Sequence, residues 1–163
     1  HMNTRFLATT KRWFGGGADL NPPIPYAEDT ADFHAAMRAA CDPHGADHYE
    51  RFRQWADDYF WIPHRGVARG VGGIFYDHLE GDFAANFAFT KAVGEAFLAI
   101  FPVLVRRRMG TPASEEDRRT MLAYRGRYAE FNLVYDRGTA FGLKTGGNVE
   151  AILMSLPPAA VWE

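Results

Sequence analysis

The sequence is short of cysteine and lysine, has little net charge, and lacks long apolar runs. Cys41 is the only cysteine among 163 residues, so no disulfide can form within the chain, which is typical of a reducing compartment. A net charge of −2 argues against a nucleic-acid-binding surface. No run reaches the roughly 18 apolar residues of a membrane span, and no secretory signal opens the chain. We therefore expect a cytoplasmic protein without a membrane span.

The abundant residue types, which are aromatic residues and arginine, indicate a packed protein and are also suited to binding flat or acidic molecules. Hydrophobic residues make up 47% of the chain and aromatic residues 15%, enough for a core and also for the lining of a pocket. Fifteen arginines stand against three lysines. Arginine binds carboxylates through two parallel hydrogen bonds, although the base composition of a genome produces the same bias.

The pattern of apolar residues predicts an α+β fold in a single domain covering residues 1–163. Strands are expected at 5–8, 11–20 and 70–76, and helices at 29–40, 47–59, 87–108 and from Ser114 onward. Residues 127–135 alternate between apolar and polar, and 149–156 are apolar, which predicts two further strands. The expected architecture is a mostly antiparallel sheet flanked by helices.

The ends of the predicted helices carry charged or capping side chains. Asp29 or Thr30 is expected to cap the first helix, and the acidic run after Ser114 suits a helix start. Arg106, Arg107 and Arg108 fall at the end of the longest helix, where cations are favourable, and are expected to be solvated.

Three consecutive glycines at 15–17 interrupt a predicted strand and are followed by Asp19. Glycine weakens a strand unless another group must approach its backbone closely. That group can be a flat ligand, or the neighbouring backbone at a bulge or tight strand crossing. Asp19 can accept hydrogen bonds from ligand N–H groups, or it can cap the turn at Asn21.

The first residues place a second polar set on a strand. His1, Asn3 and Arg5 alternate with other residues and would project from one face. They would bring a proton donor, an amide and a cation together. The alternative is that His1 and Met2 are a remnant of a cleaved tag followed by an ordinary strand.

Two further segments combine glycine with charged residues. His64, Arg65 and Arg69 lie in a loop before a strand, where the arginines can bind carboxylates or pair with acidic residues such as Asp57, Asp58 or Glu80. Residues 142–148 form a glycine-rich turn whose N–H groups can bind an anion or simply reverse the chain. The histidine spacings match no zinc signature, and no Ser-His-Asp or Cys-His signature is present.

Taken in order, these segments resemble one family, the oxygen-dependent coproporphyrinogen oxidases. The resemblance rests on WFGGGADL at 13–20, HRGVARGVGG at 64–73 and RGRYAEFNLVYDRGTAFGLKTGG at 125–147. The family also has a His-x-Asn-x-Arg segment before its glycine strand, which matches His1, Asn3 and Arg5 and favours a native His1. Family members are nearly twice as long, so we expect the N-terminal portion and the C-terminal end to be missing.

The resemblance implies an enzyme that converts coproporphyrinogen III to protoporphyrinogen IX in haem synthesis. Two propionates are oxidatively decarboxylated to vinyls with O₂ as co-substrate and without an organic cofactor. His1 would be the proton donor, and Asp19 the acid that meets the pyrrole N–H groups. The implied substrate-binding residues are Asn3, Thr4, Arg5, Arg65, Arg69, Gly146, Gly147 and Asn148.

The resemblance also implies a homodimer, with an interface from about Tyr128 to Glu163. Some bacterial members are assigned a divalent metal, and His1, His34 and His64 match three of its ligands. Asn148 departs from the family, where many members carry arginine. A tetrapyrrole or anion carrier without catalysis is the alternative on the same scaffold, and a metal hydrolase using the scattered histidines is a third hypothesis.

Overall fold

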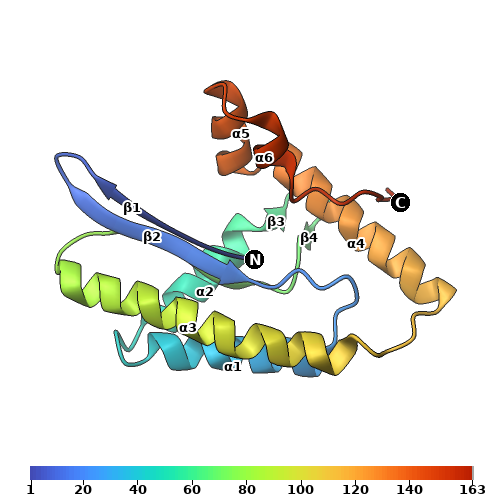
Figure 1. Cartoon of the computed structure of the whole chain (residues 1–163), viewed down its shortest axis with the longest axis horizontal. Coiled ribbons are helices and arrows are strands. Elements are labelled where there is room, and N and C mark those ends of the chain that lie inside the picture. The colour runs from blue at the N-terminus through green and yellow to red at the C-terminus, as the bar shows by residue number, and fades with distance from the viewer. Residues whose placement is uncertain (163) are drawn as a thin grey trace. The chain divides into compact units, whose positions relative to one another are not determined.

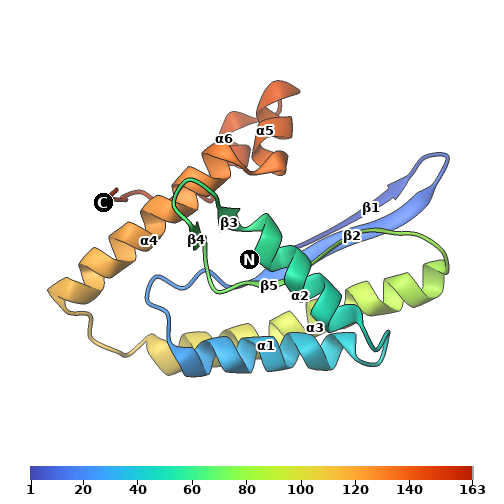
Figure 2. The same cartoon turned by 180° about the vertical axis from the view of Figure 1, so that it is seen from behind.

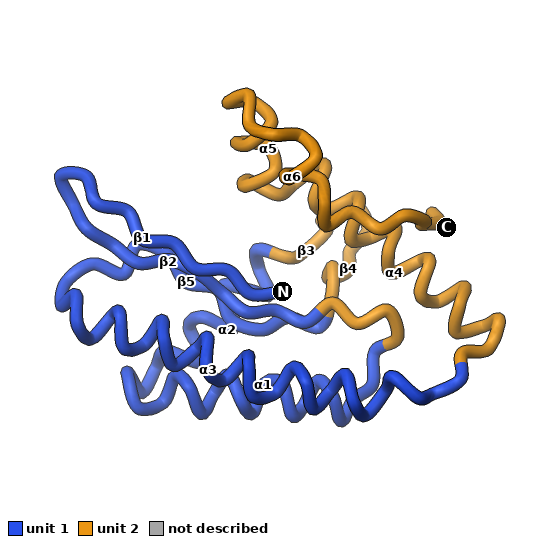
Figure 3. The backbone as a smooth tube through the Cα atoms, viewed as in Figure 1, with its two compact units in different colours: residues 1–20, 25–59, 71–112 blue, residues 21–24, 60–70, 113–163 orange. Residues whose placement is uncertain are grey.

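The computed structural model describes residues 1–162, which form two compact units (Figures 1 and 3). Unit 1 contains residues 1–20, 25–59 and 71–112, and unit 2 contains 21–24, 60–70 and the chain from 113 onward. Glu163, the end of the predicted domain and of the predicted interface, lies outside the described residues. The α+β class is confirmed: helices predominate, with a small antiparallel sheet.

Unit 1 is built on a three-stranded antiparallel sheet in the order β1-β2-β5. Its strands are β1 (Met2–Ala8), β2 (Arg12–Asp19) and β5 (Gly73–Leu79). The three strands predicted in this part of the chain are therefore confirmed. The third starts at Gly73 rather than at residue 70, because Gly72 has a φ of +78° that an extended strand does not allow. Asp19 of β2 lies opposite Gly73 of β5.

Three helices pack with this sheet to form the core of unit 1. They are α1 (Ala27–Cys41), α2 (His48–Tyr59) and α3 (Phe83–Arg108). In both views α1 and α3 lie side by side (Figures 1 and 2), and Figure 2 shows α2 close to β5. Each of the three helices and the sheet contributes large side chains to one apolar cluster. The most deeply buried of these are Phe33, Met37, Phe52, Tyr76, Phe89 and Val93.

α3 departs from the expectation that no segment could span a membrane. By length and composition it is apolar enough to cross one, and 22% of its most apolar window is buried. Phe89, Val93 and Leu104 nevertheless belong to the apolar cluster of unit 1. Within this unit, α3 is a core helix that leaves a broad apolar flank exposed.

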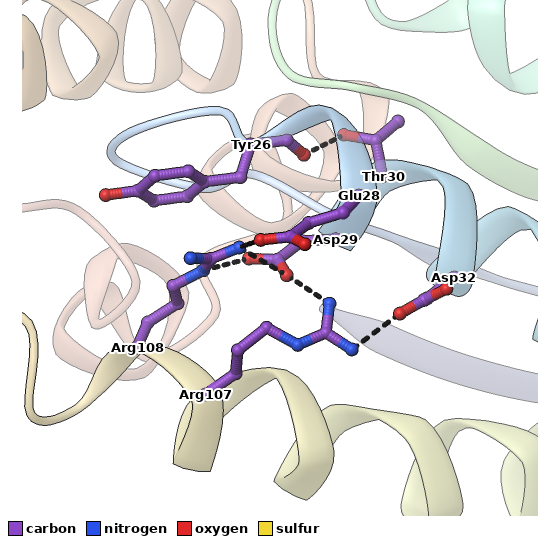
Figure 4. Close-up of polar contacts among 7 residues, drawn as sticks. All are labelled: Tyr26, Glu28, Asp29, Thr30, Asp32, Arg107 and Arg108. Carbon is purple, nitrogen blue, oxygen red and sulfur yellow. Dashed lines mark hydrogen bonds and ion pairs between the residues drawn. The ribbon is translucent and has the colours of Figure 1, made fainter.

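The arginines at the end of α3 were predicted to be solvated, and for two of them this is wrong (Figure 4). Arg107 Nη1 donates to Asp29 Oδ1 at 2.6 Å, and Arg108 Nε donates to Asp29 Oδ2 at 2.8 Å. Arg107 also pairs with Asp32, and Arg108 with Glu28. Asp29, expected to cap α1, is instead a buried acid that ties α1 to α3, and no side-chain cap forms at Tyr26. No sequence pattern predicts that the start of α1 meets the end of α3.

Unit 2 is mainly helical and contains a minimal hairpin. Its elements are β3 (Trp61–Ile62), β4 (Val67–Ala68), α4 (Glu115–Val134), α5 (Arg137–Lys144) and α6 (Val149–Leu153). The predicted helix after Ser114 is confirmed, and it begins with a capping box in which Ser114 and Asp117 exchange hydrogen bonds.

The strands predicted at 127–135 and 149–156 are wrong, because α4 continues to Val134 and α6 occupies Val149–Leu153. The buried residues in the last turns of α4 are Gly126, Tyr128, Ala129, Phe131 and Asn132, whereas Leu133 and Val134 are exposed. That spacing is helical, with neighbours three and four residues apart. The apparent alternation arose from treating both Phe131 and Leu133 as core. Asp136, expected in a turn, caps α5 by accepting from the Thr139 N–H at 2.6 Å.

Candidate functional site

One face of the unit 1 sheet carries Asn3 and Arg5 of β1 together with His1, the residue before the strand. His1, Asn3 and Arg5 alternate along the strand, and their contacts confirm that they share a face. Arg5 Nη1 donates to Asn3 Oδ1 at 3.2 Å. Thr4 lies one residue from both Asn3 and Arg5 along the strand, so its side chain lies on the opposite face and the structure does not bring it into the group.

Asp19 joins this group from the end of β2. Its backbone N–H donates to the carbonyl oxygen of His1 at 2.9 Å, which holds the two residues side by side. His1 Nδ1 and Asp19 Oδ1 are then 3.0 Å apart, in a hydrogen-bonded pair. Asp19 is only 2% exposed. The predicted proton donor and the predicted acidic centre are therefore in direct contact.

The three glycines are required by close packing on both faces of β2. A Cβ on Gly15 would lie 2.3 Å from Asp77 Oδ1, and one on Gly16 would lie 2.9 Å from the Tyr76 hydroxyl. A Cβ on Gly17 would lie 2.6 Å from the Ile74 carbonyl oxygen. The structure thus supports the tight strand crossing. It also leaves positions 15 and 17 without side chains on the face that carries Asp19.

An aromatic wall borders the same face. Tyr59 of α2 stacks on Phe75 of β5 with ring centroids 4.8 Å apart and planes 8° apart, and Trp55 contacts Phe75 at 5.6 Å. The Arg5 guanidinium carbon lies 5.4 Å from the centre of the Phe75 ring. Within unit 1, this face therefore combines an acid, a histidine, a cation, a glycine strip and aromatic rings.

In unit 2, two of the predicted residues of the loop at 64–69, His64 and Arg65, contact Glu130, an acid that no sequence motif singled out as a site residue. Arg65 Nε donates to Glu130 Oε2 at 2.6 Å, while His64 pairs with Glu130 Oε1 and, at 2.6 Å, with the Tyr135 hydroxyl. Partial burial opposes ionisation of this carboxyl. The hydrogen bonds from His64 and Arg65 prevail and hold the pKa of Glu130 below its ordinary value. Glu130, a partner of Arg65 here, was not among the acidic residues that the sequence suggested for it.

Arg69 belongs to the interior of unit 2. Its side chain is 4% exposed. The guanidinium carbon lies 3.9 Å from the centre of the Phe60 ring and 5.0 Å from that of Phe131, and Nη1 donates to Asn132 Oδ1 at 3.3 Å. This arrangement is a cation–π cage around a buried arginine. The structure does not present this guanidinium to a ligand carboxylate.

The glycine-rich turn at 142–148 caps two helices instead of forming an anion-binding nest. The N–H groups of Gly146 and Gly147 donate to the carbonyl oxygens of Leu143 and Gly142, which is a Schellman motif ending α5. Asn148 Oδ1 accepts from the N–H groups of Glu150 and Ala151 and so caps α6. The nest hypothesis fails for Gly146 and Gly147, because their N–H groups already donate to carbonyl oxygens at the end of α5.

This cap makes a testable difference at Gly146, whose φ is +73°. Replacement by alanine is expected to destabilise the full-length protein by about 1 kcal/mol, the cost of a left-handed conformation for a residue with a Cβ. Gly110→Ala is the matched control, since Gly110 has neither a positive φ nor an atom within 4 Å of an added Cβ. Chemical denaturation measures both. A Gly146→Ala variant of unchanged stability but weakened substrate binding would contradict the capping role.

The predicted metal ligands His1, His34 and His64 are each engaged by protein atoms. His34 Nδ1 bonds the Tyr49 hydroxyl and Nε2 bonds the Val71 carbonyl oxygen, both at 2.9 Å. Both ring nitrogens of His64 are likewise hydrogen-bonded. Among residues 1–162, no three His, Cys, Asp or Glu side chains converge as a metal-ligand set. The side chains as they lie here do not fit a metal.

The comparisons with known proteins point to one family. Residues 1–163 match the family model described as coproporphyrinogen III oxidase. Over 163 residues the chain is 53% identical to the oxygen-dependent coproporphyrinogen-III oxidase of Rickettsia bellii (strain OSU 85-389), covering 99% of this chain and 58% of the relative. The protein of the same name from Rickettsia africae (strain ESF-5) is 54% identical over 159 residues, which cover 97% of this chain and 57% of the relative. The chain thus spans somewhat more than half the length of these relatives.

Proposed function

Because this chain belongs to the coproporphyrinogen III oxidase family, we propose that it is part of an oxygen-dependent coproporphyrinogen III oxidase. The substrate would be coproporphyrinogen III, and the product protoporphyrinogen IX. The observation that carries the proposal is the sheet face of unit 1, where a buried acid, a histidine and an arginine border a strip of glycine. The family match indicates which reaction to expect, and the side chains on this face are chemically suited to that reaction.

The chemistry of the substrate suits that face. Coproporphyrinogen III is an electron-rich tetrapyrrole whose N–H groups can donate to one acid, a role that we give to Asp19. Its propionates need cations, and Arg5 lies on the same face with its guanidinium held in place by Asn3. Phe75 and the glycine strip offer flat surfaces for pyrrole rings. A carrier would need the cation and the aromatic surface, but not a histidine hydrogen-bonded to a buried acid.

In the proposed reaction the Asp19 carboxylate accepts a hydrogen bond from a pyrrole N–H, which makes the ring more electron-rich and more reactive toward O₂. For each propionate, the β-carbon loses a hydrogen, the carboxylate leaves as CO₂, and a vinyl group forms. The two electrons released reduce one O₂ to hydrogen peroxide, and a proton is taken up. His1, held by Asp19 at 3.0 Å, is placed to supply that proton. No organic cofactor enters this balance.

No step of the proposal passes through a metal. The family resemblance matched His1, His34 and His64 to metal ligands of some bacterial members, but the hydrogen bonds of His34 and His64 use both of their ring nitrogens. A neutral imidazole binds a metal through a ring nitrogen that carries neither a proton nor another partner. His34 and His64 are therefore given a hydrogen-bonding role in this proposal, and His1 that of the proton donor.

We further propose a cytoplasmic homodimer whose interface includes residues from Tyr128 toward the end of the chain. Several large apolar residues in this region are exposed in unit 2, among them Leu133, Val134, Phe141 and Met154. Exposed apolar side chains of this kind are typical of a surface that another protein surface covers. Arg65 remains a candidate for a propionate, since its side chain is partly exposed beside Glu130.

An aerobic turnover assay on the full-length protein tests the proposed function. Incubation with coproporphyrinogen III is expected to release CO₂ and to give a product that oxidises to fluorescent protoporphyrin. Prior treatment with a chelator, with metal content checked by elemental analysis, is expected to leave the rate unchanged. Substrate binding without turnover would favour the carrier, and loss of activity on chelation that an added divalent ion restores would overturn the metal-free reaction.

A further inference from the structure

We propose that Asp77 is a positioning residue for Arg5, which it orients so that the guanidinium can receive one carboxylate of the substrate. This inference rests on the proposed function and deepens it. No sequence motif marks Asp77. It lies on β5, whereas Arg5 lies on β1, so the two residues occupy the outer strands of the sheet on either side of β2.

The contacts leave a defined part of the guanidinium for a ligand. Arg5 Nε donates to Asp77 Oδ1 at 3.2 Å, and Nη2 lies 3.0 Å from Asp77 Oδ2. Nη1 donates to Asn3 Oδ1 at 3.2 Å. Guanidinium has five N–H groups, two of them on each terminal nitrogen. With one N–H of Nη1 donated to Asn3 and Nη2 paired with Asp77, the second N–H of each terminal nitrogen is the group that we propose binds a substrate carboxylate.

The middle strand is shaped to let this pair form. Gly15 lies opposite Arg5, and a Cβ there would lie 2.3 Å from Asp77 Oδ1 and 2.8 Å from Arg5 Nε. The register between β2 and β5 also shifts between Phe14 and Gly16. Such a bulge re-aims side chains beside it. Gly15 and the bulge together allow Arg5 and Asp77 to meet above β2.

Asp77 is itself held in place by the residue after it. The backbone N–H of His78 donates to Asp77 Oδ1 at 3.2 Å, and His78 has a φ of +51°, which is unusual for a residue with a Cβ. The His78 ring packs on Trp13, with centroids 4.4 Å apart. A non-glycine residue stays in this region only when its surroundings fix it, and such positions cluster at ligand sites.

Orientation and charge make opposite predictions for the loss of this carboxylate. Asp77 neutralises Arg5, so if charge alone mattered, its removal would strengthen the attraction of the site for an anionic substrate. If Asp77 positions Arg5, its removal lets the guanidinium move and weakens binding, because a preorganised donor loses less entropy on binding. The side chains of Arg5 and Asp77 are 34% and 21% exposed, which leaves the pair within reach of a ligand.

The test is the steady-state kinetics of the full-length Asp77→Asn variant with coproporphyrinogen III in air. We expect KM to rise about tenfold with kcat little changed, as for loss of a charge-assisted contact that binds ground and transition states alike. Glu80→Gln is the matched control, since it removes an acid from an exposed pair with Lys11 at the far end of the sheet, and it is expected to change neither constant.

An Arg5→Gln background shows whether Asp77 acts through Arg5. Adding Asp77→Asn to that variant is expected to raise KM no further, because the residue to be positioned is gone. Gly15→Ala keeps both charges but displaces the Arg5–Asp77 pair, so it is also expected to raise KM. It serves as the test if the Asp77→Asn variant folds poorly. An unchanged or lowered KM in the Asp77 variant, or a full effect in the Arg5→Gln background, would overturn the inference. A wild-type enzyme without turnover would instead overturn the proposed function.

Discussion

Replacing Asp19 by asparagine in the full-length protein is expected to lower kcat for coproporphyrinogen III by about 10³-fold. Asparagine keeps the shape of the side chain but loses the negative charge that meets the pyrrole N–H groups. It also weakens the hold on His1, whose Nδ1 lies 3.0 Å from the Asp19 carboxylate. Two contributions to the proposed chemistry are therefore lost together. Product fluorescence after aerobic incubation measures the rate.

A matched variant separates this effect from a general loss of an acid. Asp47 pairs with Arg51 on the surface of unit 1, so Asp47→Asn makes the same chemical change away from the sheet face and is expected to leave kcat unaltered. Circular dichroism establishes that both variants are folded. Near-normal turnover of the Asp19 variant, with substrate binding unchanged, would remove Asp19 from the mechanism.

The second large effect concerns stability, at the ion pairs that join α1 and α3 (Figure 4). Asp29 is buried and accepts from both Arg107 and Arg108. Asp29→Asn is expected to lower the free energy of unfolding by about 2 kcal/mol, less than for a fully buried pair because the arginines are partly exposed to solvent. The corresponding fall in the midpoint of thermal unfolding is about 5 °C. Calorimetry on the full-length protein measures it.

The stability difference between the wild type and the Asp29→Asn variant depends on pH, and its direction follows from the pKa of Asp29. The hydrogen bond from Arg108 holds the pKa of Asp29 below its ordinary value, against the opposing effect of burial, and Arg107 adds to it. A lowered pKa in the folded state contributes stability above the unfolded pKa of about 4, and this is lost as the pH falls through the folded value. The difference between wild type and variant should therefore shrink below about pH 4.

The control for the stability prediction is Glu50→Gln, which removes an acid from the exposed Arg38–Glu50 pair. It is expected to change the unfolding midpoint little, because exposed pairs contribute little. Equal losses in the two variants, or a difference for Asp29→Asn that persists at low pH, would show that the ion pairs between α1 and α3 do not stabilise unit 1 as proposed.

Sequence patterns located the elements of unit 1 well and part of unit 2 poorly. The strands at β1, β2 and β5 carry strong signals, namely alternation, a glycine strip and a proline stop. In unit 2 the ambiguity lay at 127–135, where residues two apart and residues three or four apart are both apolar. Helix continuation from the capping box at Ser114 decided the structure there. Local periodicity could not decide it, because the burial of Tyr128 and Phe131 depends on distant parts of unit 2.

The sequence by itself determined the family, the antiparallel strands of unit 1 and the shared face of His1, Asn3 and Arg5, because these depend on ordered motifs and on alternation along one strand. Only the tertiary structure decided the partners. It brought Asp77 to Arg5 across Gly15, placed Glu130 beside Arg65, buried Arg69 among aromatic rings, and joined Asp29 to the end of α3. Each of these contacts joins residues that are far apart along the chain, and the reach and direction of a side chain are fixed only when the backbone elements pack.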